Sequence, residues 1–363
     1  MLNADLLKLF LPGTTAFVIG ILLTPFISSY LYRHKLWKKK AGKVDLQGNA
    51  TTIFNNLHKD KEVGTPKMGG IVIWASVVVT VIGFWIVGHL SPDSLAERFN
   101  FLSRSQTFIP MAVLLLGALV GLYDDYLDVS GSKDHKAGGL SLKKRLVVVA
   151  VIGLICGLWF FVKLGVSTIG LPFGQSLPLG PFFPVFFMIV AMAVYAGGVI
   201  DGLDGLAGGI FAAAFVAYGG IAFFQHQYDL AALCSVLVGA ILAFLWFNVP
   251  PARFYMAETG SMALTLCLTT VAFMTDSLGH GYGILVLPII GFLLVITVAS
   301  VIIQVISKKL RGGKKVFLVA PIHHHFEAKG WSAAKVTMRY WILAIVLAML
   351  GMLLAVMQTG AVH

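Results

Sequence analysis

Ten separate runs of mostly apolar residues divide this chain, and each is long enough to cross a bilayer. A helix needs roughly 20 such residues to span a hydrocarbon core ~30 Å thick. Runs such as Val147–Val151 do not alternate apolar with polar residues, which excludes the strands of a membrane barrel. We therefore expect an all-α polytopic membrane protein with ten transmembrane helices. Their windows are residues 9–31, 69–90, 107–123, 144–163, 181–198, 206–225, 230–248, 261–276, 283–305 and 339–358.

The composition excludes the other broad classes of protein. Hydrophobic residues make up 58% of the chain and charged residues only 12%, whereas soluble domains carry about 25% charged residues. The three cysteines lie inside apolar runs, without the spacing of a metal site or a disulfide framework. The first apolar run lacks a cleavage site and is expected to be a retained helix. We find no room for a soluble domain between the spans, so residues 1–363 are expected to form a single membrane domain.

Basic residues are distributed unequally between the connections. The connections after the first, third, fifth, seventh and ninth windows hold 23 of the 27 Lys and Arg residues. Because basic loops stay in the cytoplasm, these connections are expected to face the cytoplasm, with both termini outside. The net charge of +11 is therefore concentrated on one face, where it suits anionic headgroups or a phosphorylated substrate.

Five of the 16 acidic residues follow apolar runs on that same basic side. A single carboxylate there is most simply a solvated helix end. Five from three connections are better explained by a shared cleft, since a carboxylate at the bilayer centre costs about 2.5–3.5 kcal/mol. Carboxylates also suit Mg²⁺, which accepts one or two of them and completes its shell with water and phosphate oxygens. The five acids are Asp124, Asp125, Asp201, Asp204 and Glu258.

Three consecutive histidines, His323, His324 and His325, follow a run of lysines and arginines. A zinc site is one interpretation, but no cysteine accompanies them and neighbouring histidines seldom all reach one metal ion. Imidazoles that donate hydrogen bonds to phosphate oxygens among lysines fit the segment better. Upstream of the second window, Lys61 and Lys67 are candidates for contact with a diphosphate, although both also obey the positive-inside rule.

Together these segments resemble the phospho-N-acetylmuramoyl-pentapeptide-transferase family (MraY, translocase I), within the polyprenyl-phosphate N-acetylhexosamine-1-phosphate transferase superfamily. Asp-Asp-Tyr126 and Asp-Gly-Leu-Asp-Gly205 mark the superfamily, and Pro-Ile-His-His-His-Phe-Glu-Ala-Lys-Gly-Trp331 marks the muramoyl-pentapeptide branch. The likeness runs from about Leu7 to Met357. It implies transfer of phospho-MurNAc-pentapeptide from UDP to undecaprenyl phosphate with Mg²⁺ as cofactor, in a bacterial inner membrane. The resemblance is also compatible with a homodimer.

The resemblance also implies roles for individual residues. Asp124, Asp125 and His323 would be catalytic, and Glu258 with Asp125 would hold the metal ion. Tyr255 would stack on uracil. The substrate-binding positions implied by the resemblance are Lys61, Lys136, Asp201, Asp204, Asn248, Tyr255, Gln304, His324 and His325.

Four positions depart from the family pattern. Glu258 stands where the family usually has Asp, which lengthens the arm of the metal ligand by one methylene. Gly198 replaces an Asn, Lys67 replaces a Thr, and Asp128 stands where a Lys is common. These changes bear on the roles of single residues more than on the reaction.

Three other functions compete with this interpretation. A GlcNAc-1-phosphate transferase of the same superfamily is the nearest, although its histidine motif is usually spaced differently. A transporter would need charges near the middle of the bilayer and broken helices there, whereas these acids gather at one surface. A structural scaffold would leave five carboxylates and three histidines without a purpose.

Overall fold

The computed structural model describes residues 2–38, 63–90, 99–130, 139–277 and 281–359. Within these residues ten helices are long and apolar enough to cross a membrane, which confirms the fold class expected from the apolar runs. They are α1 (Leu2–Arg33), α3 (Ile71–Leu90), α5 (Phe108–Ser130), α6 (Leu142–Lys163), α7 (Phe183–Gly197) together with the 3-10 turns that extend it to Gly180–Ile200, α8 (Leu206–Phe224), α9 (Tyr228–Asn248), α10 (Ala257–Ser277), α12 (Phe292–Leu310) and α14 (Ala333–Thr359).

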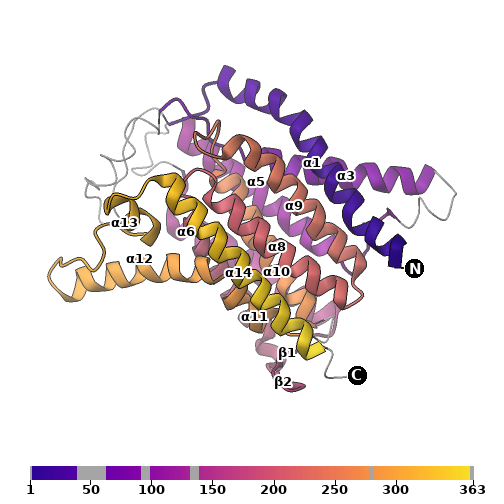
Figure 1. Cartoon of the computed structure of the whole chain (residues 1–363). Coiled ribbons are helices and arrows are strands. Elements are labelled where there is room, and N and C mark those ends of the chain that lie inside the picture. The colour runs from indigo at the N-terminus through magenta and orange to yellow at the C-terminus, as the bar shows by residue number, and fades with distance from the viewer. Residues whose placement is uncertain (1, 39–62, 91–98, 131–138, 278–280, 360–363) are drawn as a thin grey trace.

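Shorter elements join these helices. Helices α11 (Gly283–Ile290) and α13 (Ile322–Ala328) flank α12, and the 3-10 turns η1 (Gly180–Phe182) and η2 (Gly198–Ile200) flank α7. Strands β1 (Thr168–Leu171) and β2 (Gln175–Pro178) pair as an antiparallel hairpin. In Figure 1 this hairpin lies at the bottom of the bundle, the N- and C-terminal ends lie on its right-hand side, and α13 lies at the left.

Helix α10 occupies the centre of the bundle. Of its most apolar 18-residue window, 89% is buried, more than for any other described span, although its hydropathy is the lowest. The hydroxyls of Thr265, Thr269 and Thr270 donate to carbonyls one turn earlier, at 2.7–2.9 Å. Because these polar groups are satisfied within the helix and face protein, their presence at membrane depth is tolerated.

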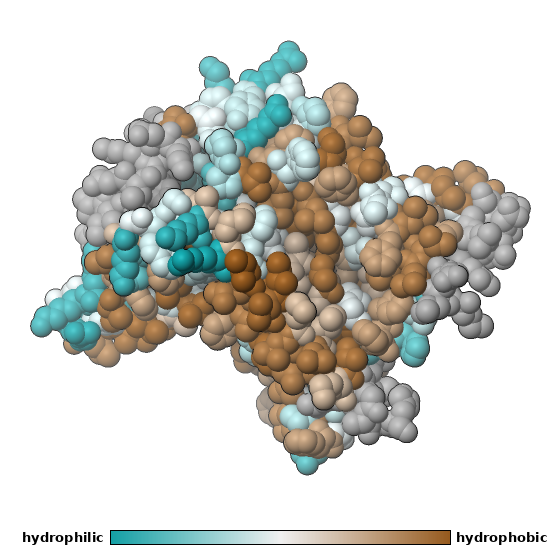
Figure 2. Space-filling view, in the orientation of Figure 1, coloured by the Kyte–Doolittle hydropathy of each residue, from teal (hydrophilic) through white to brown (hydrophobic). Residues whose placement is uncertain are grey.

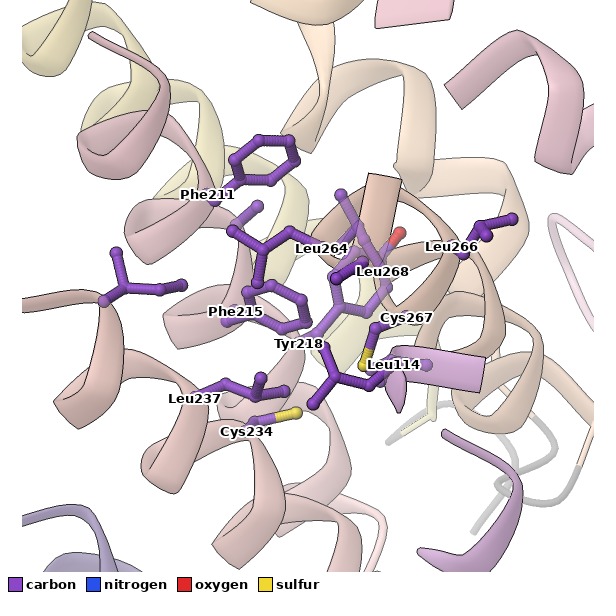
Figure 3. Close-up of a cluster of buried hydrophobic side chains, with 14 of the residues drawn as sticks. Leu114, Phe211, Phe215, Tyr218, Cys234, Leu237, Leu264, Leu266, Cys267 and Leu268 are labelled. Atoms are coloured by element: carbon purple, nitrogen blue, oxygen red, sulfur yellow. The ribbon is translucent and has the colours of Figure 1, made fainter. Parts of the chain in front are cut away.

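Side chains from four helices meet around α10. Figure 3 shows Leu114 of α5, Phe215 and Tyr218 of α8, Cys234 of α9 and Cys267 of α10 in one apolar cluster. The Tyr218 hydroxyl donates to the carbonyl of Gly283 at 2.8 Å, which satisfies the polar tip of a fully buried ring. All three cysteines of the chain are free and buried, as expected.

The ninth apolar window is not a single helix. The chain breaks at Gly291, between α11 and α12, and α12 then leaves the bundle at a steep angle to α14 (Figure 1). Pro288 lacks the amide hydrogen of a regular helix and Gly291 is a poor helix former, so the break has a local cause. A transmembrane window predicts that a helix is present but not that it is continuous.

The surface separates into apolar and polar regions, as the alternation of apolar windows and basic connections in the sequence predicts. Figure 2 shows hydrophilic residues gathered at the upper edge and at the left, where α13 and the basic end of α12 lie, and hydrophobic residues over the middle of this face. On this face the described helices therefore present a broad apolar region beside a polar end, as expected of a bundle that spans a membrane.

Candidate active site

Asp125 links the end of α5 to the start of α10. Its Oδ2 atom accepts hydrogen bonds from the Thr259 amide at 2.8 Å and the Thr259 hydroxyl at 2.6 Å. Its Oδ1 atom accepts the amide of Glu258 at 3.4 Å. The first amides of a helix lack partners within the helix and carry the positive end of its dipole. Asp125, only 1% exposed, thus satisfies the N-terminus of α10 from another helix.

A second acidic residue reaches the same helix terminus. Asp201, in the turn after η2, accepts the amide of Ala257 through Oδ2 at 2.9 Å. The start of α10 therefore brings together acids from two of the three connections singled out in the sequence, next to Glu258 from the third. This convergence is what the shared-cleft interpretation predicts.

A glycine makes the approach of α5 to α10 possible. A Cβ atom on Gly121 would collide with the backbone carbonyl group of Glu258. Gly121 lies one turn before Asp125, on the same face of α5. The Gly in the Gly-Leu-Tyr-Asp-Asp segment therefore sets how close Asp125 lies to the amides that it binds.

Arg145 lies between two of the acids. Its guanidinium forms an ion pair with Glu258 and lies 3.8 Å from Asp124. The Tyr195 hydroxyl is 3.3 Å from the other Glu258 oxygen. Asp124 also accepts the amide of Leu140. Each of these acids thus already faces a positive charge or an N–H group.

The sequence interpretation missed both Arg145 and Tyr195. Arg145 had been counted only as one of the basic residues near a membrane surface, and Tyr195 lies inside an apolar window. An arginine one residue inside an apolar run is a usable signal, because a charge at that depth needs a partner. Nothing in the sequence alone singles out Tyr195.

Lys67 and Asp128, two of the departures from the family pattern, contact each other. The Lys67 ammonium forms an ion pair with Asp128, one turn beyond Asp124 on α5. Burial lowers the pKa of Lys67, but the carboxylates of Asp125, Asp128 and Asp124 outweigh burial, so the pKa lies above its usual value. Lys67 is therefore a fixed positive charge beside the acids.

The second part of the site surrounds the Asp201–Gly205 turn. Asn248 is 4% exposed; it accepts the Gly205 amide at 3.0 Å and donates to the Phe254 carbonyl at 2.8 Å. Asp204 accepts the amide of Ala252 at 3.2 Å. Both side chains hold the loop that leads to α10, so the structure gives them a positioning role whatever they bind.

Tyr255 lies at the edge of this loop. Its amide donates to the Pro66 carbonyl at 2.9 Å, and its carbonyl accepts the Gly69 amide at 2.8 Å. This two-way pairing fixes the segment before α10 against the segment before α3. The ring is partly exposed, so stacking on a flat base stays a prediction.

The three histidines have different surroundings. His323 is fully buried, and its Nε2 atom lies beside Gly202 in the Asp201–Gly205 turn. His324 Nδ1 lies 2.7 Å from Glu327. His325 Nδ1 accepts the amide of Leu318 at 3.1 Å. Partial burial, and then the charge of Lys329, lower the pKa of His325. Contact of any of them with phosphate stays a prediction.

Three predicted substrate-binding residues remain, Gln304, Lys61 and Lys136. Gln304 on α12 bonds the backbone of residues 316–317 through both its amide oxygen and its amide nitrogen, at 2.9–3.0 Å. It thereby fixes the segment that leads to α13. Lys61 and Lys136 lie outside the described residues.

The donor set suits Mg²⁺, although no three acidic, histidine or cysteine side chains among the described residues gather closely enough to enclose a metal ion. Glu258 faces a positive group, the Arg145 guanidinium, and Asp125 keeps one lone-pair direction beyond the three hydrogen bonds that it accepts. Mg²⁺ is held by one or two carboxylates together with waters and substrate phosphates. These carboxylates therefore fit a Mg²⁺ ion that arrives with a phosphorylated substrate, and no zinc cage is formed by the described histidines.

Comparisons with known proteins agree with this geometry. A protein-family model, glycosyl transferase family 4, matches residues 107–276, which include Asp124, Asp125, Asp201 and Glu258. A phospho-N-acetylmuramoyl-pentapeptide-transferase of a Geobacillus species is 34% identical over 94% of this chain and 96% of its own length. The enzyme of the same name from Bacillus subtilis is 33% identical over 94% and 95%. That of Rubrobacter xylanophilus is 35% identical over 81% and 84%. The chain belongs to the phospho-N-acetylmuramoyl-pentapeptide-transferase family.

Proposed function

We propose that this protein transfers phospho-MurNAc-pentapeptide from UDP-MurNAc-pentapeptide to undecaprenyl phosphate, giving lipid I and UMP. The observation that carries the proposal is the meeting of Asp125 and Asp201 at the first amides of α10, beside Glu258 and Asp124. Relatives that carry this name match the chain over nearly its whole length.

The proposed reaction exchanges one phosphoanhydride bond for another. An oxygen of the lipid phosphate attacks the phosphorus that bears the sugar, and the bond from that phosphorus to the bridging oxygen of UMP breaks. Such transfers depend on positioning and charge neutralisation more than on covalent work by the protein. An aspartyl-phosphate route is a chemical alternative.

The acids divide the work by their surroundings. Asp125 is committed to the α10 amides and the Thr259 hydroxyl, so it orients Glu258 and offers at most one lone-pair direction to a ligand. Asp124 keeps an oxygen 3.8 Å from Arg145 and is placed to orient the lipid phosphate or take its proton at Oδ2. Bound Mg²⁺, held by Glu258 and Asp125, would neutralise charge on the diphosphate.

Arg145 and the Asp201–Gly205 turn complete the proposed site. The Arg145 guanidinium is placed to meet phosphate oxygens when Glu258 turns toward a metal ion. Asp201 and Asp204 rim the loop on which a nucleotide would lie, with Tyr255 beside it. His323 lies under Gly202, from which it would reach a phosphate only if the turn shifts.

The membrane orientation is part of the proposal. The acids around the start of α10 and the Asp201–Gly205 turn lie at the end of the bundle where the basic connections emerge. The positive-inside rule assigns that end to the cytoplasm. The substrate nucleotide would therefore be met on the inner face of a bacterial cytoplasmic membrane.

The experiment is incubation of the full chain in detergent with UDP-MurNAc-pentapeptide, undecaprenyl phosphate and Mg²⁺, with UMP and the lipid product measured. We expect UMP and lipid I in equal amounts. A parallel reaction with UDP-GlcNAc tests the nearest relative function; product from UDP-GlcNAc alone would overturn the proposal. The Asp124→Asn variant controls for contaminating activity.

A further inference from the structure

The Lys67–Asp128 ion pair joins two elements that both contribute to the site. Lys67 lies in the segment before α3, and Asp128 lies on α5, three residues after Asp125 and four after Asp124. Residues three and four apart on a helix share a face. Their side chains are 22% and 10% exposed, so bulk water screens the pair only partly.

The backbone holds Lys67 in place. Its amide donates to the Leu36 carbonyl at 2.9 Å, and the preceding Pro66 carbonyl accepts the Tyr255 amide at 2.9 Å. Two residues later, the Gly69 amide donates to the Tyr255 carbonyl at 2.8 Å. The segment is thus bonded both to the end of α1 and to the segment before α10, so the ammonium is a fixed charge rather than a mobile surface group.

The two charges act on the neighbouring acids with opposite sign. Lys67 interacts electrostatically with Asp125 and Asp124 as well as with Asp128. A positive charge at this place repels a divalent cation that approaches Asp125, and the negative charge of Asp128 offsets that repulsion. Partly buried charges couple more strongly than exposed ones.

We propose that the Lys67–Asp128 pair sets the affinity of the adjacent Asp125 and Glu258 carboxylates for a divalent cation. The pair is a positioning and charge-balancing device, and neither member needs to touch the metal ion. This inference rests on the metal site of the proposed function. It predicts effects of opposite sign for the two single substitutions, which a merely structural ion pair does not.

The test measures Mn²⁺ binding to the full chain in detergent by electron paramagnetic resonance, without substrates, so that turnover plays no part. Lys67→Met is expected to tighten Mn²⁺ binding roughly tenfold, because an opposing charge is removed. Asp128→Asn is expected to weaken it by about the same factor, because the Lys67 charge is left uncompensated. The double variant should lie within about threefold of the wild type, since the two terms cancel.

Controls separate charge from folding. Lys67→Arg keeps the charge and should bind Mn²⁺ like the wild type, and Lys144→Met, at an exposed lysine on α6, should change binding less than about twofold because its charge is screened. Thermal unfolding and size-exclusion profiles check that each variant is folded. Single substitutions that both weaken binding, or that leave it unchanged, would overturn the role of the pair alone. A wild-type chain that binds no Mn²⁺ would overturn the metal site as well.

Discussion

Asp125 binds Thr259 twice, through the amide at 2.8 Å and the hydroxyl at 2.6 Å, although the two residues lie on different helices. The carboxylate does the work of a helix cap from outside the helix. This relationship makes the position of Glu258, one residue earlier, depend on α5. The part of the candidate site that holds Asp125 and Glu258 is therefore built on the contact between two helices, and this contact gives it a rigid frame.

Replacing Asp124 by Asn should abolish turnover while the fold is kept. The amide side chain has almost the volume of the carboxylate, and its oxygen still accepts the Leu140 amide. It has neither the charge nor the basicity to orient or deprotonate the lipid phosphate. The measurement is UMP release, with the melting temperature as control; near-normal turnover would remove Asp124 from the mechanism.

Replacing Arg145 by Met should lower activity about 10- to 100-fold, the usual cost of removing a group that orients a ligand residue. The substitution leaves Glu258 without its cationic partner and Asp124 without its nearest positive charge. Arg145→Lys keeps the charge and should recover part of the loss. Equal loss in Met and Lys variants would show that geometry, not charge, decides the role.

Removal of divalent cations should stop the reaction reversibly. EDTA is expected to abolish UMP release, and added Mg²⁺ should restore it, because the carboxylates are themselves anions and repel a diphosphate unless a divalent cation offsets the negative charges. The control is the unfolding temperature in EDTA, which should change little because the described helices are held together by apolar side chains and by hydrogen bonds between protein groups. Turnover that persists in EDTA would contradict the metal role of Glu258.

Asn248→Ala should destabilise the protein by about 2–4 kcal/mol, because the Gly205 amide and the Phe254 carbonyl both lose a buried partner. Trp341→Phe provides the comparison. It removes a single bond to the same loop, from the indole N–H to the Gly205 carbonyl at 3.0 Å, and should cost less. Thermal or denaturant unfolding measures both. A neutral Asn248→Ala variant would show that the loop is held by other contacts.

His325 should stabilise the fold only when neutral. Its pKa is lowered in the folded state, so its contribution is full above about pH 6.5, the ordinary value in an unfolded chain. The contribution is lost as the pH falls through the lower folded value, because protonated Nδ1 no longer accepts the Leu318 amide. The melting temperatures of wild type and His325→Asn, measured from about pH 8 to about pH 5 so that the range brackets the ordinary value of about 6.5, should converge on the acid side if this account is right.

The number of spans was predictable because apolar length alone decides whether a helix crosses a bilayer. The position of Asp124, Asp125, Asp201 and Glu258 at one end of the bundle also followed, since connections on one side of a membrane emerge together. Neither inference required knowledge of how the helices pack.

What escaped prediction depends on packing. Arg145 and Tyr195 reach Glu258 only because α6 and α7 flank the start of α10, which no local pattern records. The Lys67–Asp128 pair was visible in the sequence as two separate departures, but the contact between them joins residues 61 positions apart. Asn248 and Gln304 were singled out for ligand binding, whereas the hydrogen bonds described for them go to backbone atoms of the protein.

Helix α10 is one uninterrupted element of 21 residues. It is buried along its length, and side chains or amides of other elements form hydrogen bonds with both of its ends. At its far end Asp276 accepts the amides of Gly170, from the β1–β2 hairpin, at 3.0 Å and of Ile284 at 3.2 Å. A helix about 30 Å long that is held at both ends cannot tilt or slide at one terminus without straining the hydrogen bonds at the other. The hairpin at one end of the bundle and the candidate site at the other end are thus mechanically joined through a single helix.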